Sequence, residues 1–252
     1  EIFGSATKAT WEAHAIPFTA SMTNVQIHID NPDDHPGFSG PTGGPLVRLP
    51  ASPFAAAENG DTVLVGPGTY TGAGSVVFNA SGRDLAIGGI AGSELTIYDG
   101  ENQRACAWVY GNGDKVVTFV GLTFRNGLGK TNIGGGLSSG GVSIYESGQA
   151  IVRQCRFDSN HAESDGGAMV VGEDSSVVID SCVFIDNTSI RSGGAIYAVT
   201  STVELIDSRF EKNRSADGGG IFCSNSDLSA IQVTMRRNES AGFNTGNGAI
   251  YV

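Results

Sequence analysis

The sequence lacks any long apolar run and has few basic residues. No stretch approaches the roughly 18 consecutive apolar residues that a membrane-spanning helix requires. The 15 Lys and Arg are outnumbered by 26 Asp and Glu, which gives a net charge of −11. Because such a surface repels phosphates, we expect neither nucleic acid nor an anionic membrane as a partner, and no membrane insertion by this chain.

Signatures of enzymes, cofactor sites and metal sites are also scarce. The four Cys are too few for a disulfide scaffold, and no two of them have metal-site spacing. The sequence contains no nucleophile elbow and no phosphate-binding loop. Gly218-Gly219-Gly220 lies at a repeat corner rather than before a helix. We therefore expect no cofactor.

One cluster near the N-terminus has enough oxygen and nitrogen for a metal ion. It matches neither the spacing of an EF-hand nor that of a zinc site, and interspersed prolines indicate a turn-rich loop capped by Asp. The sequence thus predicts no metal site and leaves this cluster as the alternative. Its members are His28, Asp30, Asp33, Asp34 and His35.

Glycine is the residue in excess. The chain has 37 Gly among 252 residues, about twice the usual ~7%. A hydrophobic content of 40% is too high for a disordered chain. Stretches compatible with a helix are short and soon broken by Gly or Pro, so the sequence predicts an all-β fold.

Two phrases repeat with one period in the second half of the chain. Gly-Gly-Ala-Ile and its variants begin at residues 166, 193, 218 and 247, and Phe-x-x-Asn lies between them. Successive Asn of the second phrase are 27, 26 and 25 residues apart. Two independent motifs with one period indicate a solenoid. The Asn column is Asn160, Asn187, Asn213 and Asn238, with Asn126 as a candidate fifth member.

Each period contains three short β runs, which predicts a right-handed single-stranded parallel β-helix with three strands per coil of about 26 residues. Alternation places Phe157, Phe184 and Phe210 in one inward column. The Gly pairs suit positive φ angles and close approach between coils. The Asn column suits an inward ladder of amides, which would leave Asn79 as the only credible glycosylation site among the four sequons.

Two resemblances follow from these residues. The paired Gly-Gly-Ala-Ile and Phe-x-x-Asn repeats over residues 121–252 resemble those of the chlamydial polymorphic outer-membrane proteins. Gly60-Asp61-Thr62-Val63 and the phrase that follows resemble the first coil of pectin-lyase-like β-helix proteins. The resemblance implies surface display and adhesion, and it transfers the repeat Gly and Asn as fold determinants only.

The same pattern divides the chain into a cap and a solenoid. Residues 1–50 lack the period and are expected to form an N-terminal cap or extension, with a strand at 25–29; residues 51–252 are expected to form the β-helix. A short helix at 53–59 would cover its lower end, and a Gly-rich loop at 127–141 would protrude. The sequence has no initiating Met and stops within a strand, so we expect a longer polypeptide or a partner subunit over the C-terminal coil.

Asp207, Arg209 and Glu211 are the best candidates for catalysis. β-Helix lyases pair an Arg base with acidic residues that hold Ca²⁺, so this trio would fit a polysaccharide lyase or epimerase. Opposite charges two residues apart are also typical of a solvated strand face. We favour the second interpretation, because Val183 and Ile185 interrupt any acidic groove on the neighbouring coil.

An outward column of Val170, Tyr197, Phe222 and Tyr251 is the candidate binding surface. Its aromatic members Tyr197, Phe222 and Tyr251 could stack on sugar rings, contact another protein or stabilise a partly covered sheet.

The cysteines leave a separate question open. Cys155 and Cys182 occupy the same column one coil apart, where either a disulfide or a reduced, core-filling pair would fit.

These observations favour a non-enzymatic role. We expect an extracellular or cell-surface protein with a structural or adhesive β-helical stalk, as a module of a larger chain or fibre. Its partners would be other subunits or copies of itself, and surface polysaccharide is a further candidate. The alternatives are a carbohydrate-active β-helix enzyme and a polysaccharide-binding module.

Overall fold

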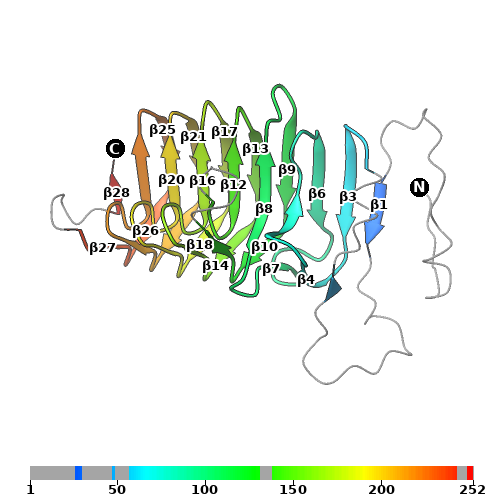
Figure 1. Ribbon diagram of the computed structural model, residues 1–252, viewed down its shortest axis with the longest axis horizontal. Coiled ribbons are helices and arrows are strands. Elements are labelled where there is room, and N and C mark those ends of the chain that lie inside the picture. The colour runs from blue at the N-terminus through cyan, green and yellow to red at the C-terminus, as the bar shows by residue number, and fades with distance from the viewer. Residues whose placement is uncertain (1–25, 30–46, 49–56, 131–137, 243–248, 252) are drawn as a thin grey trace, which may run out of the picture.

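The chain winds into a solenoid of parallel β-strands. The computed structural model describes residues 26–29, 47–48, 57–130, 138–242 and 249–251, and every element in them is a strand. All of the strand pairings are parallel. Equivalent strands stack along one axis (Figure 1), so each coil lies on the one before it. The predicted right-handed parallel β-helix is confirmed.

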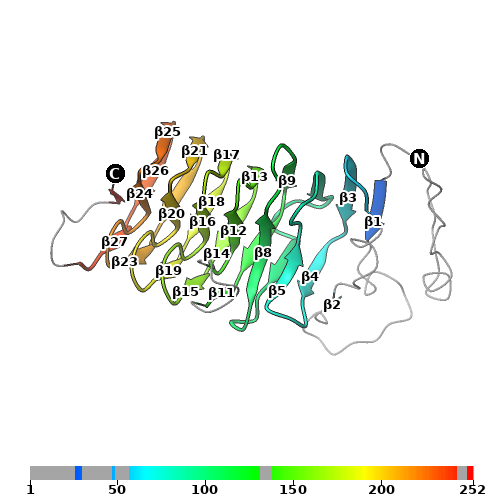
Figure 2. The same ribbon diagram turned by 45° about the horizontal axis from the view of Figure 1, so that its top comes forward.

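The strands form four sheets (Figure 2), of which three extend along most of the solenoid and the fourth is confined to its later coils. Sheet A contains β1 (Gln26–Ile29), β3 (Asp61–Val65), β6 (Leu85–Gly89), β9 (Val116–Val120), β13 (Gln149–Arg153), β17 (Ser176–Asp180), β21 (Thr202–Ile206) and β25 (Asp227–Ile231). Sheet B contains β2 (Val47–Arg48), β4 (Gly68–Thr71), β7 (Thr96–Asp99), β10 (Thr123–Arg125), β14 (Arg156–Asp158), β18 (Val183–Ile185), β22 (Arg209–Glu211) and β26 (Thr234–Arg236). Sheet C contains β5 (Val76–Asn79), β8 (Ala105–Tyr110), β12 (Val142–Tyr145), β16 (Met169–Gly172), β20 (Ile196–Val199), β24 (Ile221–Ser224) and β28 (Ile250–Tyr251). Sheet D contains β11 (Leu128–Gly129), β15 (His161–Ala162), β19 (Thr188–Ser189), β23 (Arg214–Ser215) and β27 (Glu239–Ser240).

Sheet D is the one feature of the coil that the repeat did not predict. Its strands have two residues each, and β15, β19, β23 and β27 directly follow the Asn of the Phe-x-x-Asn phrase. Two residues are too few to show alternation, so only the three longer strands of each coil were recognisable from the sequence.

An aromatic stack fills the centre of the solenoid. Phe157, Phe184 and Phe210 are neighbours in sheet B and fully buried. Their ring centroids are 4.6 and 4.5 Å apart, with interplanar angles of 4° and 0°. The predicted inward column is confirmed, and Tyr70, Tyr98 and Phe124 extend it toward the N-terminus.

The Asn side chains form a buried ladder beside this stack. The Nδ2 of Asn187 donates to the Oδ1 of Asn213 at 2.9 Å and to the carbonyl of Phe157 at 3.1 Å. Its Oδ1 accepts from the backbone N–H and the Nδ2 of Asn160. The same pattern links Asn213 to Asn238. Because each amide is used by its neighbours, Asn187 and Asn213 have no room for a sugar.

The proposed fifth member of the ladder is wrong. Asn126 pairs in register with Ser159 rather than with Asn160, has a φ of 49° and donates to the carboxylate of Asp99. Gly127 occupies the ladder position, where its N–H donates to the Oδ1 of Asn160 at 2.9 Å. Asn126 is two residues after Phe124, whereas the Asn of each other repeat is three residues after its Phe or Met. This shorter spacing puts the side chain of Asn126 on the outside of the turn.

The two Gly of each repeat have different roles. Gly193 has a φ of 66°, in the left-handed region that favours glycine. Gly194 instead allows the coils to approach, since a Cβ there would lie 2.1 Å from the carbonyl oxygen of Gly219. Each pair therefore combines a tight corner with a close contact to the next coil.

Strand pairing also involves part of the N-terminal region. The strand expected at 25–29 is present as β1, which pairs with β3, and β2 pairs with β4. The expected helix lies mostly outside the described residues, and Ala57 and Glu58 at its end are not helical. Much of the expected protruding loop, at 131–137, also lies outside them. The domain boundary at residue 50 stays a prediction.

Candidate functional site

The trio Asp207, Arg209 and Glu211 does not converge on a reactive centre. The Nη1 of Arg209 donates to the Oε2 of Glu211 at 2.8 Å along the same strand, β22. Asp207 lies in the turn before that strand, with a φ of 47° and an exposed side chain. Because the Arg209 guanidinium is already hydrogen-bonded to the neighbouring carboxylate, it is not free to act on a substrate.

A second ion pair of the same kind lies on the outer face of sheet B. Arg156 and Asp158 form the same contact on β14, also at 2.8 Å. The strand between the two pairs places Val183 beside Arg156 and Ile185 beside Asp158. The apolar interruption expected from the sequence is therefore present, and the charges on this face are balanced locally.

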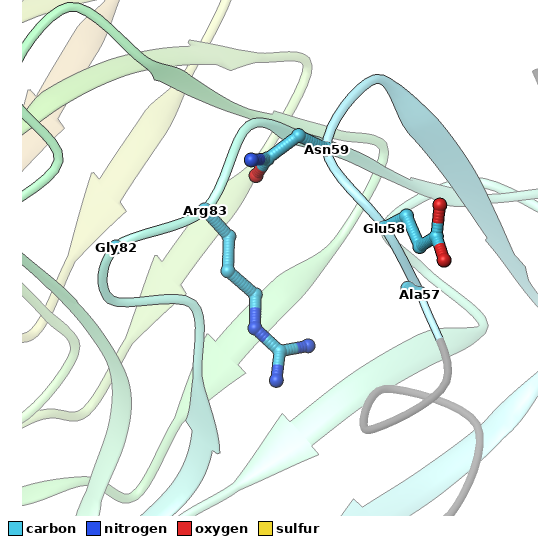
Figure 3. A pocket seen from close by; sticks show the side chains of 5 residues that line it. All are labelled: Ala57, Glu58, Asn59, Gly82 and Arg83. Carbon is cyan, nitrogen blue, oxygen red and sulfur yellow. The ribbon is translucent and has the colours of Figure 1, made fainter. Parts of the chain in front are cut away.

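A shallow hollow lies near the N-terminal end of the solenoid. Its volume is about 490 Å³ (Figure 3), and it is lined by Ala57, Glu58, Asn59, Gly82 and Arg83. The Oδ1 of Asn59 accepts from the backbone N–H of Asp84, so this side chain holds two coils together. Glu58 alone supplies a carboxylate to the lining, so this hollow lacks the paired acids of a glycosidase. No sequence motif predicts this hollow, because its residues come from two separate turns of the chain.

Metal binding finds no support in the described residues. Among them, no three His, Cys, Asp or Glu side chains lie close enough together to hold an ion. The alternative metal cluster is outside this range apart from the backbone of His28 in β1, so the prediction about it stays untested.

All four Cys are buried free thiols. Cys155 and Cys182 lie in adjacent coils without a disulfide, which gives the reduced alternative. Burial raises the pKa of Cys155 well above its usual value, and the neighbouring Cys182 raises it further. Burial also raises the pKa of Cys223 to about 11. Cys155 and Cys223 therefore stay protonated at neutral pH, and all four side chains fill space in the core.

Thiol titration checks this arrangement. At pH 8 we expect the folded chain to react slowly with an aromatic disulfide reagent, because burial blocks access to all four thiols and the raised pKa values of Cys155 and Cys223 leave little thiolate there. After unfolding in guanidinium, four thiols are expected to react at once. Two reactive thiols instead of four would mean that Cys155 and Cys182 are bonded.

The expected outward aromatic column runs along sheet C, but its rings cover one another. Tyr197 and Phe222 stack at 5.4 Å and 11°, and Phe222 and Tyr251 at 4.7 Å and 2°. Rings stacked along the axis face each other, so they present mainly edges to the surroundings. Such a column does not provide the open ring faces that bind sugars. Val170 extends the column but is fully buried, so its expected exposure is wrong.

A second aromatic group on sheet C was missed by the sequence analysis. Trp108, Tyr110 and Tyr145 project from β8 and β12 on the same outer face. Trp108 and Tyr110 stack at 5.6 Å, and Tyr145 meets Tyr110 edge-on at 6.0 Å. Alternating aromatics at 108 and 110 were the available signal, but they precede the regular repeat and so belong to no recognisable column.

Fold and surface define a β-solenoid whose buried Asn side chains link successive coils. The family described as the right handed beta helix region matches residues 88–252, and the chain belongs to this family. Membership supports a structural or a carbohydrate-related role in general terms. No curated protein and no solved structure matches the chain significantly. The described part of the chain contains no helix long and apolar enough to span a membrane.

Proposed function

We propose that the chain is a β-helical stalk of an extracellular or cell-surface protein, with a structural or adhesive role in a larger chain or fibre. The continuous Asn ladder carries this proposal. Asn160, Asn187 and Asn213 are buried and linked through their amides from coil to coil. A rod held together by contacts along its axis is suited to presenting other segments at a distance.

The outer surface supports the same role. On the outer face of sheet B, Arg209 pairs with Glu211 within one strand and Arg125 pairs with Asp99 of the neighbouring coil, so these charges are already engaged. The resemblance of the repeats to the chlamydial polymorphic outer-membrane proteins adds a precedent for surface display. Asn79 is exposed at the end of β5, so its side chain is accessible for a glycan.

The cellular location of the protein tests this proposal directly. Antibodies raised against the folded chain are expected to label intact, non-permeabilised cells of the source organism or their extracellular material. Labelling that appears only after permeabilisation would contradict a surface role. Light scattering of the purified protein would in addition show whether copies assemble into larger particles.

The enzymatic alternative has its own test. Against a panel of uronate polymers with added Ca²⁺, we expect no turnover, because Arg209 is held by Glu211 and Asp207 does not join them. Turnover that is lost in Arg209→Ala would revive the lyase. This substitution removes a partly exposed ion pair, so it should change the unfolding free energy by less than about 1 kcal/mol.

A further inference from the structure

Exposed cations gather at the corner where sheet B turns into sheet D in the last two coils. We call this group the basic corner, and its members are Lys212, Arg214, Arg236 and Arg237. None of the four forms an ion pair or a side-chain hydrogen bond with the described residues. The carboxylates that adjoin them, Asp186 and Glu239, are fewer, so positive charge is in excess here. This excess contrasts with the net charge of −11 for the whole chain.

Stacking of the coils places like charges above one another at this corner. Lys212 and Arg237 occupy equivalent turn positions with φ angles of 56° and 52°, and the N–H of Lys212 donates to the carbonyl of Arg236. Successive coils are ~4.8 Å apart along the axis, so these cations repel one another in the isolated chain. Carboxylates of another molecule would relieve that repulsion.

A corner of two earlier coils, where sheet C turns into sheet A, is acidic. We call this group the acidic corner, and its members are Glu146, Glu173 and Asp174. All three are exposed, and no cation of the described chain forms an ion pair with them. Lys115, at the same corner one coil earlier, instead donates to the carbonyl of Gly82 in the coil before its own.

The two corners lie on opposite edges of the solenoid. Each coil passes through sheets A, B, D and C in that order, so two sheets separate the corners in either direction. Glu146 and Glu173 begin the coils that contain β14 and β18, whereas Lys212 and Arg237 belong to the coils that contain β22 and β26. The corners are therefore offset by two coils, or ~10 Å along the axis, and one chain cannot bring its own corners together.

We propose that the basic corner of one chain binds the acidic corner of a second copy, which lies alongside with a parallel axis and a displacement of two coils. This contact sets Lys212 and Arg237 opposite Glu146 and Glu173, so both groups of unpaired charges gain partners. Because the contact uses a different surface on each chain, it is heterologous and continues into a staggered row of solenoids. The inference rests on the fibre role proposed above and names the partner and the surfaces.

Sedimentation equilibrium at millimolar chain concentration tests the contact through its salt dependence. Exposed ion pairs are individually weak, so we expect weak association that grows with concentration. At ~0.15 M salt the screening length of about 8 Å weakens the long-range repulsion between two acidic chains but preserves close ion pairs, which are weakened only near ~1 M. We expect masses above the 26.0 kDa of the monomer at the lower salt and the monomer at the higher salt. A monomer in both, or an assembly that the higher salt leaves intact, overturns the proposal.

Charge reversal at the basic corner is expected to abolish the association. Lys212→Glu combined with Arg237→Glu makes both corners acidic, and the turn accommodates a carboxylate because Asp186 occupies the equivalent position with a φ of 54°. Lys130→Glu combined with Arg153→Glu is the matched control, since it changes the net charge equally at exposed residues away from both corners. Circular dichroism melts should show that both double variants fold. Association that persists in the corner variant, or is lost equally in the control, overturns the proposal.

A mixing experiment separates complementarity of the corners from charge in general. Glu146→Lys combined with Glu173→Lys makes both corners basic. This variant and the Lys212→Glu, Arg237→Glu variant are each expected to be monomeric alone and to associate when mixed. A mixture that stays monomeric overturns the proposal. Binding of hexagalacturonate by an unaltered chain that stays monomeric also overturns it, because the occupant of the basic corner would then be an anionic polysaccharide.

The outcomes also distinguish this inference from the function on which it rests. Labelling of intact cells without association of the purified chain would reject the contact between corners and leave the surface role. Association that depends on the corners, without labelling of intact cells, would reject the surface role and leave the contact.

Discussion

A Gly194→Ala variant is expected to lose most of the stability of the folded chain. The added Cβ would lie 2.1 Å from the carbonyl oxygen of Gly219 and 2.6 Å from the backbone nitrogen of Arg214. Both are backbone atoms of the next coil, whose own strands are fixed by pairing on either side. Because the clash cannot be relieved by a side-chain rotation, we expect a destabilisation of about 4 kcal/mol or more, measured by denaturant unfolding with circular dichroism.

Gly74→Ala is the control for this variant. Nothing lies within 4 Å of a Cβ at Gly74, and its φ is outside the left-handed region. The same substitution there is expected to change the unfolding free energy by no more than about 1 kcal/mol. Equal stabilities for the two variants would contradict the tight contact between coils.

The repeating half of the chain was predictable because its local pattern and its packing agree. Phe157, Phe184 and Phe210 recur with the period of the coil, and one period brings them into register. In a solenoid each residue meets its own equivalent in the next coil, so spacing along the sequence converts directly into contact. This is why the central stack and the Asn ladder could be located from sequence alone.

Predictions failed where a coil departs from that period. Asn126 follows Phe124 one residue earlier than in the other repeats and therefore lies outside the turn, with Gly127 in its place. Val170 was assigned to an exposed column by alternation, but the preceding corner covers it, since a Cβ at Gly166 would lie 2.5 Å from its Cγ2. Alternation predicts which face of a sheet a side chain occupies. It does not predict which turn residues cover that face.

The aromatic group of Trp108, Tyr110 and Tyr145 was missed for a related reason. Trp108 and Tyr110 face outward from β8, where the coil above supplies Ser143 and Tyr145 rather than a repeated residue. The unpartnered hydroxyl of Tyr145 and the space at Gly172 become visible only when the coils are stacked. In a repeat protein, regular columns specify the scaffold, and the irregular positions are where a binding site can arise.

Asn187→Ala is expected to be a strongly destabilising substitution in the ladder. It removes the acceptor used by the backbone N–H and the Nδ2 of Asn160, and the donor to the carbonyl of Phe157. These groups are buried, so water cannot readily replace the lost bonds. With roughly 1–3 kcal/mol for each buried group left unpaired, we expect a loss of about 3 kcal/mol or more in the unfolding free energy.

Alanine substitutions of two other Asn provide the comparison for this loss of stability. Asn238→Ala removes similar bonds at a partly exposed position, where water can compensate, so we expect a smaller loss. Asn79→Ala removes a single local bond to the N–H of Ser81 on the surface and should change stability by less than about 0.5 kcal/mol. The order Asn187, Asn238, Asn79 follows from burial, because all three side chains are the same amide. If Asn187→Ala unfolded at the same denaturant concentration as Asn79→Ala, the amide ladder would not be what holds successive coils together.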